Sequence, residues 1–423
     1  MSDVLNYLVA ARRCEANELE NLSRTCDLVL VVNALVHCLQ QERGITNIFL
    51  ASSGQRDGQL RLAHLAASEQ TYRALMDWLA VAESDSEFHG GARLYTRIAF
   101  ALHTLDQVAG MRHRIADLSC NPVDSSECYK QAVSALLALV FEAADVAVEP
   151  GISRLLIALF HLMQGKEFAG RERALGAASF AAGRMTAQQI RSIEYFIDMQ
   201  EQAFARFASF AGDLRAEWAA LQSGLPLPEL ERLRRKLLSA HQRVLDQEQA
   251  DPWYLCCSAR MDELHRVETY LAELLQQQCR DKIAELRRAL GDQEQLFAHL
   301  RSQDPLSPLM AFHAQIPSSE VLDDADSVAV GHHLSQTVVE MLNSQSERLQ
   351  KLTEELASVR VNLDERKLIE RAKGILMQRQ GLDEESAYRL LRKKAMNQNR
   401  RIADVAHAVL SLADILPTDT SPQ

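Results

Sequence analysis

Long amphipathic segments with few breaks constrain this chain most strongly. Through most of the first 300 residues, apolar side chains recur at intervals of three and four, the spacing of one face of an α-helix. The 423 residues include only 17 Gly and 10 Pro, and aromatic residues make up 6% while hydrophobic residues make up 47%. Because Leu and Ala supply most of the apolar content and both favour helices, the sequence predicts an all-α fold and argues strongly against an all-β one.

Five short segments rich in Gly, Pro, Asn or Ser divide residues 1–303 into at least seven predicted helices. These segments are Ser52–Gly58, His89–Gly91, Cys120–Ser126, Glu149–Gly151 and Gly224–Pro228. Long helices joined by short loops bury their apolar faces most simply as antiparallel bundles, so residues 1–303 are expected to form helical bundles. Pro, Ser and Asp then accumulate over residues 304–334, which are predicted to be a linker.

The N-terminus and the apolar stretches predict a cytoplasmic protein. No basic region followed by an apolar run begins the chain, so no secretory signal is expected. The longest apolar stretches, such as Leu28–Val36 and Ala135–Phe141, fall short of the roughly 18 residues of a membrane span. The eight cysteines form no CxxC pair and share no ligand spacing with histidines, so we expect reduced core thiols and neither a metal nor another cofactor.

Residues 335–364 are predicted to form a coiled-coil helix. Leucine and valine alternate at three-four spacing, with one exception at Gln345: Leu342, Leu349, Leu356 and Leu363 share one heptad position, and Val338, Leu352 and Val359 share the other. Such a repeat over about four heptads favours pairing of two chains, so a homodimer is expected. A helix that packs against its own bundle would show the same pattern, and the sequence leaves that alternative open.

Charge is distributed unevenly along the chain. The net charge is −11, but residues 360–412 carry 12 Lys or Arg against 7 Asp or Glu. A small basic module is therefore attached to a large acidic body.

Three short helices are predicted within this module, at residues 365–415. The first ends near Arg379, before Gly381, and the second begins after Asp383, a favourable N-terminal cap. The turn at Asn397–Asn399 ends the second helix, and a third follows from Ile402. Their apolar faces would form a three-helix core of about fifty residues, which is marginal without further support.

The residues of the module resemble the ANTAR domain, the RNA-binding unit of bacterial transcription antiterminators. The resemblance rests on Ile369–Met377, Gly381, Glu384, Ala387–Tyr388, Leu391–Arg392, Ala395 and Ala403–Ala406. The preceding residues resemble the NIT domain, a helical module that senses nitrate and nitrite, at Leu39–Gly44 and Lys166–Ala174. Together they imply a one-component regulator that binds nitrate or nitrite. It would then bind a leader RNA hairpin so that a terminator does not form, and act only indirectly on the transcribing RNA polymerase.

Seven cations of the module are predicted to contact RNA phosphates, because they lie on helix faces opposite the expected core. They are Lys373, Arg379, Arg389, Arg392, Lys393, Arg400 and Arg401. Tyr388, the single aromatic residue of residues 365–415, is predicted to stack on an unpaired loop base. Without the resemblance, a solvated basic face and a half-buried tyrosine explain the same residues. DNA is less favoured as a partner, because no helix-turn-helix pattern is evident.

Arginine is the natural receptor for nitrate, a planar and weakly hydrated anion, because guanidinium is a planar donor that stays charged when desolvated. Arg43 and Arg173 both lie in strongly apolar helical contexts and are the predicted ligand residues. Arg260 and Arg73 are the second-choice candidates for binding the ligand.

An internal ion pair is the alternative for the two predicted arginines, with Glu42, Glu167 or Glu172 as the partner. The neighbouring Arg171 and Lys166 are expected to be exposed.

Two other functional classes remain to be compared with an RNA-binding regulator. For an enzyme, the chain offers only scattered histidines, such as His37, His161 and His265, and no HExxH motif, phosphate loop or nucleophile elbow. A sensory scaffold acting through protein contacts would not require the basic module. The sequence therefore favours the RNA-binding regulator over both.

Overall fold

The computed structural model describes residues 2–85, 88, 90–214, 218–219, 227–239, 244–303 and 325–415. These residues contain helices and no strand, which confirms the all-α prediction. The α-helices are α1 (Ser2–Ala51), α2 (Gly58–Ser84), α3 (Gly91–Ala116), α4 (Pro122–Val146), α5 (Pro150–Ala182), α6 (Ala187–Phe210), α8 (Leu227–Leu238), α9 (Ala250–Gln303), α11 (Ala325–Gln380), α12 (Glu384–Gln398) and α13 (Ile402–Ile415). Two short 3-10 helices are η1 (Gly212–Leu214) and η2 (Gln247–Gln249).

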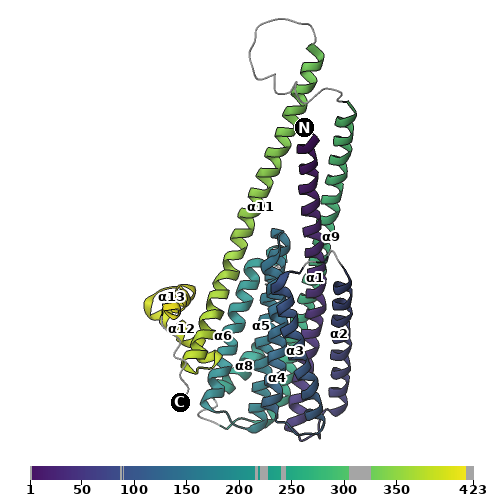
Figure 1. Ribbon diagram of the computed structural model, residues 1–423. Helices are drawn as coiled ribbons and strands as arrows, with labels where there is room; N and C mark the ends of the chain where they lie inside the picture. Colours follow the sequence, from purple (N-terminus) through teal and green to yellow (C-terminus); the bar gives the residue numbers. More distant parts are fainter. Residues whose placement is uncertain are drawn as a thin grey trace.

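Helices α1 to α9 lie side by side in an elongated bundle (Figure 1). Helix α1 packs against α2, α4 and α9, and α5 packs against α6 and α9. Helix α9 and the contacts of α5 with α4 and α1 join these two groups. The ends of α1 and α9 continue beyond the bundle beside α11 (Figure 1). Helix α5 is consequently enclosed by neighbours on several sides, and this position determines where its polar residues point.

Local caps explain where the bundle helices begin. The side chain of Asn121 accepts a hydrogen bond from the Asp124 amide at the start of α4, and that of Glu149 accepts one from the Ile152 amide at the start of α5. A proline opens each of these helices, where its missing N–H costs nothing. Four of the five predicted breaks coincide with loops of the structure or with the starts of α4 and α5. The fifth, at 224–228, lies largely outside the described residues.

Helix α1 is more apolar than its short uninterrupted stretches suggested. Among the described helices it alone is long and apolar enough to cross a membrane by length and composition, with a mean hydropathy of 1.5 over its most apolar window. The uninterrupted apolar stretches alone therefore did not show that α1 meets this criterion. In the structure 56% of that window is buried inside the bundle, as in the central helix of a packed core.

A single helix, α11, spans three regions that the sequence analysis separated. It begins at Ala325, inside the predicted linker, and continues through the predicted coiled coil into the first helix of the C-terminal module. No helix-breaking residue stands at the expected boundary near position 365. The rest of the predicted linker, residues 304–324, lies outside the described residues.

The heptad positions of α11 divide between the bundle and the surface. Val359 and Leu363 are buried in the core of the bundle, so the alternative of packing against the chain's own bundle holds there. Leu349 is 46% exposed, and Leu352 and Leu356 are half-buried. The side chains of Val338, Leu342 and Gln345 lie outside the description.

The C-terminal module consists of the end of α11 together with α12 and α13. As predicted, Asp383 caps α12 by accepting a hydrogen bond from the Ser386 amide, and Asn399, in the left-handed region with φ 48°, ends it. The core of the module is shared with the bundle, because Phe168 of α5 and Tyr195 of α6 join its apolar cluster. The module is therefore docked on the bundle, as Figure 1 shows at the lower left.

Candidate ligand site and nucleic-acid interface

Arg43 and Arg173 lie on facing helices, α1 and α5, and both are almost completely buried. Each guanidinium contacts a glycine of the opposite helix. A Cβ added at Gly170 would lie 2.7 Å from Nη2 of Arg43, and one added at Gly44 would lie 2.5 Å from Nη2 of Arg173. The two glycines thus provide the space in which two arginines cross between the helices.

Arg43 is neutralised by Glu167. Its Nη1 and Nη2 donate to the two carboxylate oxygens of Glu167 at 2.7 and 3.1 Å, and Gln40 Nε2 and Arg171 Nε donate to the same carboxylate. Burial acts to raise the pKa of Glu167, but the charges of Arg43 and Arg171 outweigh it and hold that pKa below its usual value. The alternative prediction of an internal ion pair therefore holds for Arg43, with Glu167 as the partner.

Arg173 has a different environment. Within the described part of the chain no carboxylate lies within ion-pair distance of it, and it is 3% exposed. It donates to the carbonyl oxygen of Gln40 at 3.0 Å and to Ser258 Oγ at 2.9 Å, and its Nε is buried without a hydrogen-bond partner. Its guanidinium lies 4.9 Å from the centre of the Tyr254 ring. A desolvated cation with only neutral partners is suited to an anion.

Arg171 is only 12% exposed, so the expectation that it lies at the surface was wrong. It lies between Glu167, at 2.9 Å from its Nε, and Glu384 of α12, at 3.8 Å from its Nη1. Burial acts to lower the pKa of Arg171, but these two carboxylates raise it above its usual value.

Lys166 was also expected at the surface and is instead fully buried, in an ion pair with Glu268 of α9. His265 Nδ1 lies 3.1 Å from the same Glu268 carboxylate and its ring stacks on His37, so these two histidines are not isolated. Burial and then the charge of Lys166 lower the pKa of His37 to about 2. Both corrections have one cause, since α5 is surrounded by other helices and its charged residues must find partners inside.

The two second-choice arginines differ in position. Arg260 Nη1 donates to Gln200 Oε1 at 2.7 Å, and burial, followed by the charge of Arg234, lowers the pKa of Arg260. It belongs to a separate polar cluster in which Arg234 pairs with Glu172. Arg73 of α2 is three-quarters exposed and lies 3.8 Å from Glu69, so the structure excludes it from an enclosed site.

Three polar or aromatic residues that sequence reasoning did not select contact Arg173. They are Gln40, Ser258 and Tyr254. Gln40 also donates to Glu167 and so joins the surroundings of both arginines. Gln40 lies three positions before Arg43 and therefore on the same face of the helix, and this spacing could have indicated from the sequence that it belongs to the site.

The predicted RNA-contacting cations differ in exposure. Lys393 and Arg400 are exposed, as are Arg379, which donates to the carbonyl oxygen of Ala413, and Arg401, which pairs with Glu365. Lys373 is 4% exposed and lies between two carboxylates, at 3.0 Å from Glu370 and 3.1 Å from Glu384. Its predicted phosphate contact is therefore wrong for this arrangement, because position 373 faces the start of α12.

The face of α12 that carries Tyr388 is turned toward α6. Tyr388 is 6% exposed, its hydroxyl donates to Gln202 Oε1 at 2.8 Å, and its ring lies 5.8 Å from that of Tyr195. The predicted stacking on a base is therefore excluded in this arrangement.

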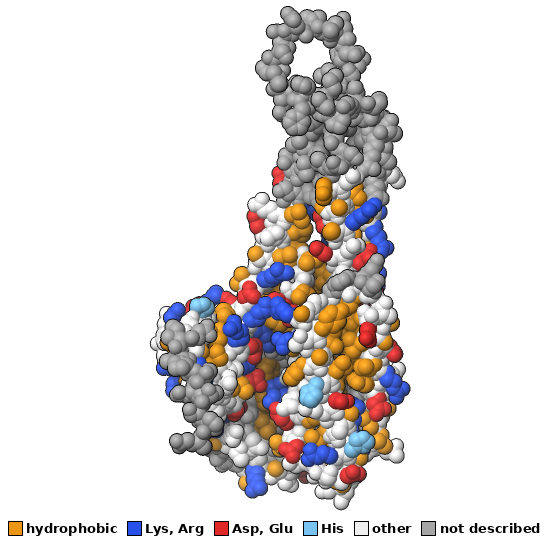
Figure 2. All heavy atoms as spheres, in the orientation of Figure 1, with side chains coloured by type: hydrophobic (Ala, Val, Ile, Leu, Met, Phe, Trp, Pro, Cys, Tyr) orange, Lys and Arg blue, Asp and Glu red, His pale blue; other side chains and the backbone are white. Residues whose placement is uncertain are grey.

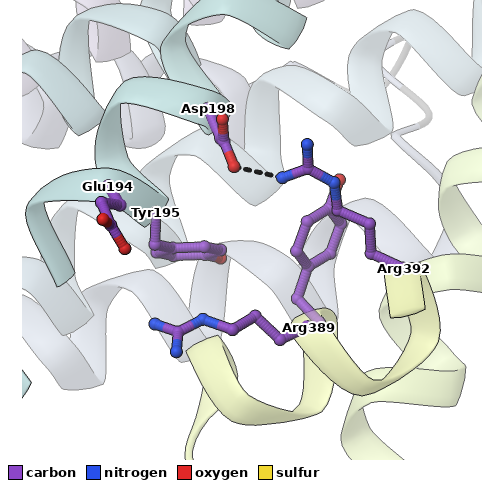
Figure 3. Close-up of a pocket in the computed structure, with 6 residues that line it drawn as sticks. Glu194, Tyr195, Asp198, Arg389 and Arg392 are labelled. Atoms are coloured by element: carbon purple, nitrogen blue, oxygen red, sulfur yellow. Dashed lines mark hydrogen bonds and ion pairs between the residues drawn. The ribbon is translucent and has the colours of Figure 1, made fainter. Parts of the chain in front are cut away.

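Arg392 pairs with Asp198 of α6, and Arg389 donates to the carbonyl oxygen of Arg191. Figure 3 shows the cavity of about 230 Å³ that remains between α6 and α12. It is lined by Glu194, Tyr195, Asp198, Tyr388, Arg389 and Arg392. In Figure 2 basic and acidic side chains lie close together where the module meets the bundle.

Comparison with known proteins places both halves of the chain. Residues 34–276 match the family model for nitrate and nitrite sensing, NIT, and residues 357–410 match the ANTAR domain. The nitrate regulatory protein of Klebsiella oxytoca is 32% identical over 411 residues, which are 97% of this chain and 95% of that protein. The chain belongs to the NIT–ANTAR family. A solved structure of the NasR transcription antiterminator is similar to this NIT–ANTAR protein with a TM-score of 0.57 and 29% identity, covering 98% of this chain and 100% of that one.

The family matches enclose both candidate sites. Arg43 and Arg173 lie inside the NIT match, and the predicted RNA-contacting residues, from Lys373 to Arg401, lie inside the ANTAR match. The NIT–ANTAR protein thus holds its candidate anion site in α1 and α5 and its candidate RNA surface on the end of α11, on α12 and on the turn before α13. The two are joined by the docked face of α12.

Proposed function

We propose that this protein is a cytoplasmic one-component antitermination regulator and not an enzyme. It binds nitrate or nitrite between Arg43 and Arg173, and in response its ANTAR module binds a leader RNA hairpin so that a terminator does not form. Its effect on the transcribing RNA polymerase is indirect. The observation that carries the sensor part is Arg173, a buried arginine with neutral partners that crosses toward Arg43.

The test of the sensor part is a thermal-shift experiment with nitrate, nitrite, chloride and sulfate. Nitrate and nitrite should raise the unfolding temperature, since a ligand that binds only the folded state stabilises it by mass action. Chloride and sulfate at equal ionic strength control for salt effects. If neither nitrate nor nitrite stabilises the protein more than chloride does, the proposed sensor function is wrong.

Nitrate should bind with only moderate affinity. It has four heavy atoms, and small ligands gain at most about 1.5 kcal/mol per atom, so the binding free energy is limited to roughly −6 kcal/mol. This corresponds to a dissociation constant of a few tens of micromolar. Isothermal titration calorimetry measures it directly, and nanomolar binding would contradict this limit on the affinity of so small a ligand.

Docking of the ANTAR module supports a restraining role for the sensor. Asp198 of α6 forms an ion pair with Arg392, and α6 covers Tyr388. Two residues proposed to contact RNA therefore face the acidic sensor instead. RNA and α6 therefore compete for one face of α12. Ligand binding would favour RNA by releasing this face.

The exposed cations should contribute to RNA binding through counterion release. Neutralising Arg400 should make the slope of log affinity against log salt shallower by about 0.7, the value of one phosphate contact on a single strand. Sequence preference should remain, because phosphate contacts position the RNA without reading it. Filter binding across a salt series with saturating nitrate measures the slope. Arg232→Gln, on the exposed part of α8, is the matched control and should leave it unchanged.

Self-association should depend on the exposed part of the heptad seam. Leu349→Asp combined with Leu356→Asp places two carboxylates in this seam, and we expect the homodimer to dissociate. Light scattering should then report half the mass. Leu363→Asp is the contrasting variant: it should destabilise the fold instead, because Leu363 is fully buried in the bundle. An unchanged mass in the double variant would show that the seam does not join two chains.

A further inference from the structure

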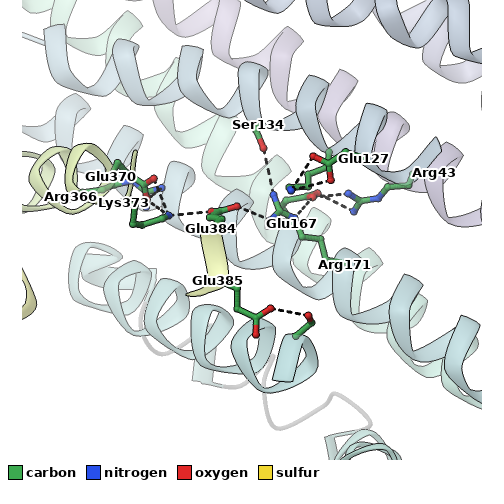
Figure 4. A network of polar contacts seen from close by, with 12 residues as sticks. Arg43, Glu127, Ser134, Glu167, Arg171, Arg366, Glu370, Lys373, Glu384 and Glu385 are labelled. Carbon is green, nitrogen blue, oxygen red and sulfur yellow. Dashed lines mark hydrogen bonds and ion pairs between the residues drawn. The ribbon is translucent and has the colours of Figure 1, made fainter. Parts of the chain in front are cut away.

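A continuous line of charged side chains connects the candidate anion site to the ANTAR module. It runs from Arg43 to Glu167, then to Arg171, and from there to Glu384, the first residue of α12 (Figure 4). The first three residues belong to the sensor, whereas Glu384 belongs to the module.

Glu167 is shared by two arginines. Both terminal nitrogens of Arg43 and the Nε of Arg171 donate to its carboxylate, which is 1% exposed. An anion bound between Arg43 and Arg173 would compete with Glu167 for Arg43. Glu167 would then depend on Arg171 for its charge balance, because a buried carboxylate without a cationic partner is strongly unfavourable.

Arg171 is shared by two carboxylates. Its Nε is 2.9 Å from Glu167, and its Nη1 is 3.8 Å from Glu384, so Glu167 is the closer partner. Glu384 has another cation, Lys373 of its own module, at 3.1 Å. If Arg171 turns fully toward Glu167, Glu384 keeps Lys373, and the module loses an attachment to α5 without exposing an unpaired charge.

We infer that Arg171 is a positioning residue that transmits occupancy of the anion site to the docking of the ANTAR module. This inference rests on the proposed function and adds its mechanism: ligand, Glu167 and Glu384 compete for the guanidiniums of Arg43 and Arg171. Because coupling between two sites is reciprocal, docking through Glu384 must also weaken ligand binding.

The test measures RNA affinity by filter binding, with and without saturating nitrate, and nitrate affinity by calorimetry. In the unsubstituted full chain, nitrate should raise RNA affinity by about tenfold, within the usual range of allosteric coupling. In Glu384→Gln, nitrate should still bind, but it should change RNA affinity by less than about twofold. Asp383 remains to cap α12 in this variant, and Lys373 keeps Glu370.

Arg171→Met breaks the same contact from the sensor side, and the double variant should behave like either single one, as expected for a single shared interaction. Asp198→Asn is the matched control: it removes a docking ion pair with Arg392 that is outside the line of charges. It should raise RNA affinity without nitrate and retain a response to nitrate.

Three results would overturn the inference. A full nitrate response in Glu384→Gln or Arg171→Met would show that the contact transmits nothing. Loss of nitrate binding in Glu384→Gln would contradict the competition, because removing the charge of Glu384 frees Arg171 for Glu167 and should leave nitrate binding intact or tighter. If the unsubstituted chain itself binds nitrate but shows no change in RNA affinity, or binds no nitrate, the proposed function fails and the inference fails with it.

Discussion

Replacing Arg173 by alanine should abolish the stabilisation that nitrate gives this protein. At a nitrate concentration one hundred times the dissociation constant, the unsubstituted chain should gain about 2.7 kcal/mol in free energy of unfolding. The variant should gain nothing, because one of the two guanidiniums is missing. It should remain folded, since no carboxylate among the described residues loses its partner. Thermal unfolding at several nitrate concentrations measures both quantities.

Arg73→Ala is the matched control for this experiment. It removes the same side chain from the exposed face of α2 and should leave the nitrate response intact. Arg260→Ala removes a buried arginine of the separate cluster around Glu172 and should also retain the response. If Arg173→Ala responds to nitrate like the unsubstituted chain, the anion site lies elsewhere.

Lys166→Met should cause the largest loss of stability among the substitutions of charged residues considered. Lys166 and Glu268 are both fully buried, so removing the cation leaves a carboxylate in the core with only His265 and no strong cation beside it. Breaking a buried ion pair in this way costs about 3–5 kcal/mol in the free energy of unfolding. For a domain of this size the unfolding temperature should fall by roughly 6–20 °C, which calorimetry can measure.

Two further variants separate the cost of the unpaired charge from the loss of the lysine side chain. Adding Glu268→Gln to Lys166→Met removes the orphaned charge and should recover a large part of the stability. Lys282→Met breaks an exposed pair with Glu285 and should change the unfolding free energy by less than about 1 kcal/mol. A Lys166→Met variant as stable as the exposed control would show that the buried pair does not hold α5 to α9.

The parts of the structure that depend on local sequence could be predicted. Apolar periodicity predicted the helices, and Asp383 predicted the start of α12, because capping involves residues a few positions apart. The apolar surroundings of Arg43 and Arg173 predicted their burial for the same reason. No helix end marks residue 365, because a heptad seam and a domain core can follow one another on one helix without a break.

The remaining features depend on contacts between distant segments. Tyr388 and its partner Gln202 are 186 positions apart, and Arg171 and Glu384 are separated by more than 200. Helical periodicity shows which face of α12 is apolar, but it does not show that α6 covers the neighbouring polar face. The burial of Lys166 likewise follows from the number of helices around α5, a property of the assembled bundle.

The continuity of α11 also restricts how its length can vary. With 56 residues at 1.5 Å each, this helix is about 80 Å long, and no hinge separates Leu363, in the bundle core, from Ile369, in the module core. Inserting one residue between them would rotate the module by about 100° around the helix axis and advance it by about 1.5 Å. Two extra turns would restore the angular phase, yet they would carry the module about 10 Å past Phe168 and Tyr195. The continuous helix thus fixes the orientation of the ANTAR module relative to the sensor bundle. A chimaera that combines the sensor of one protein with the module of another must therefore preserve this helical phase.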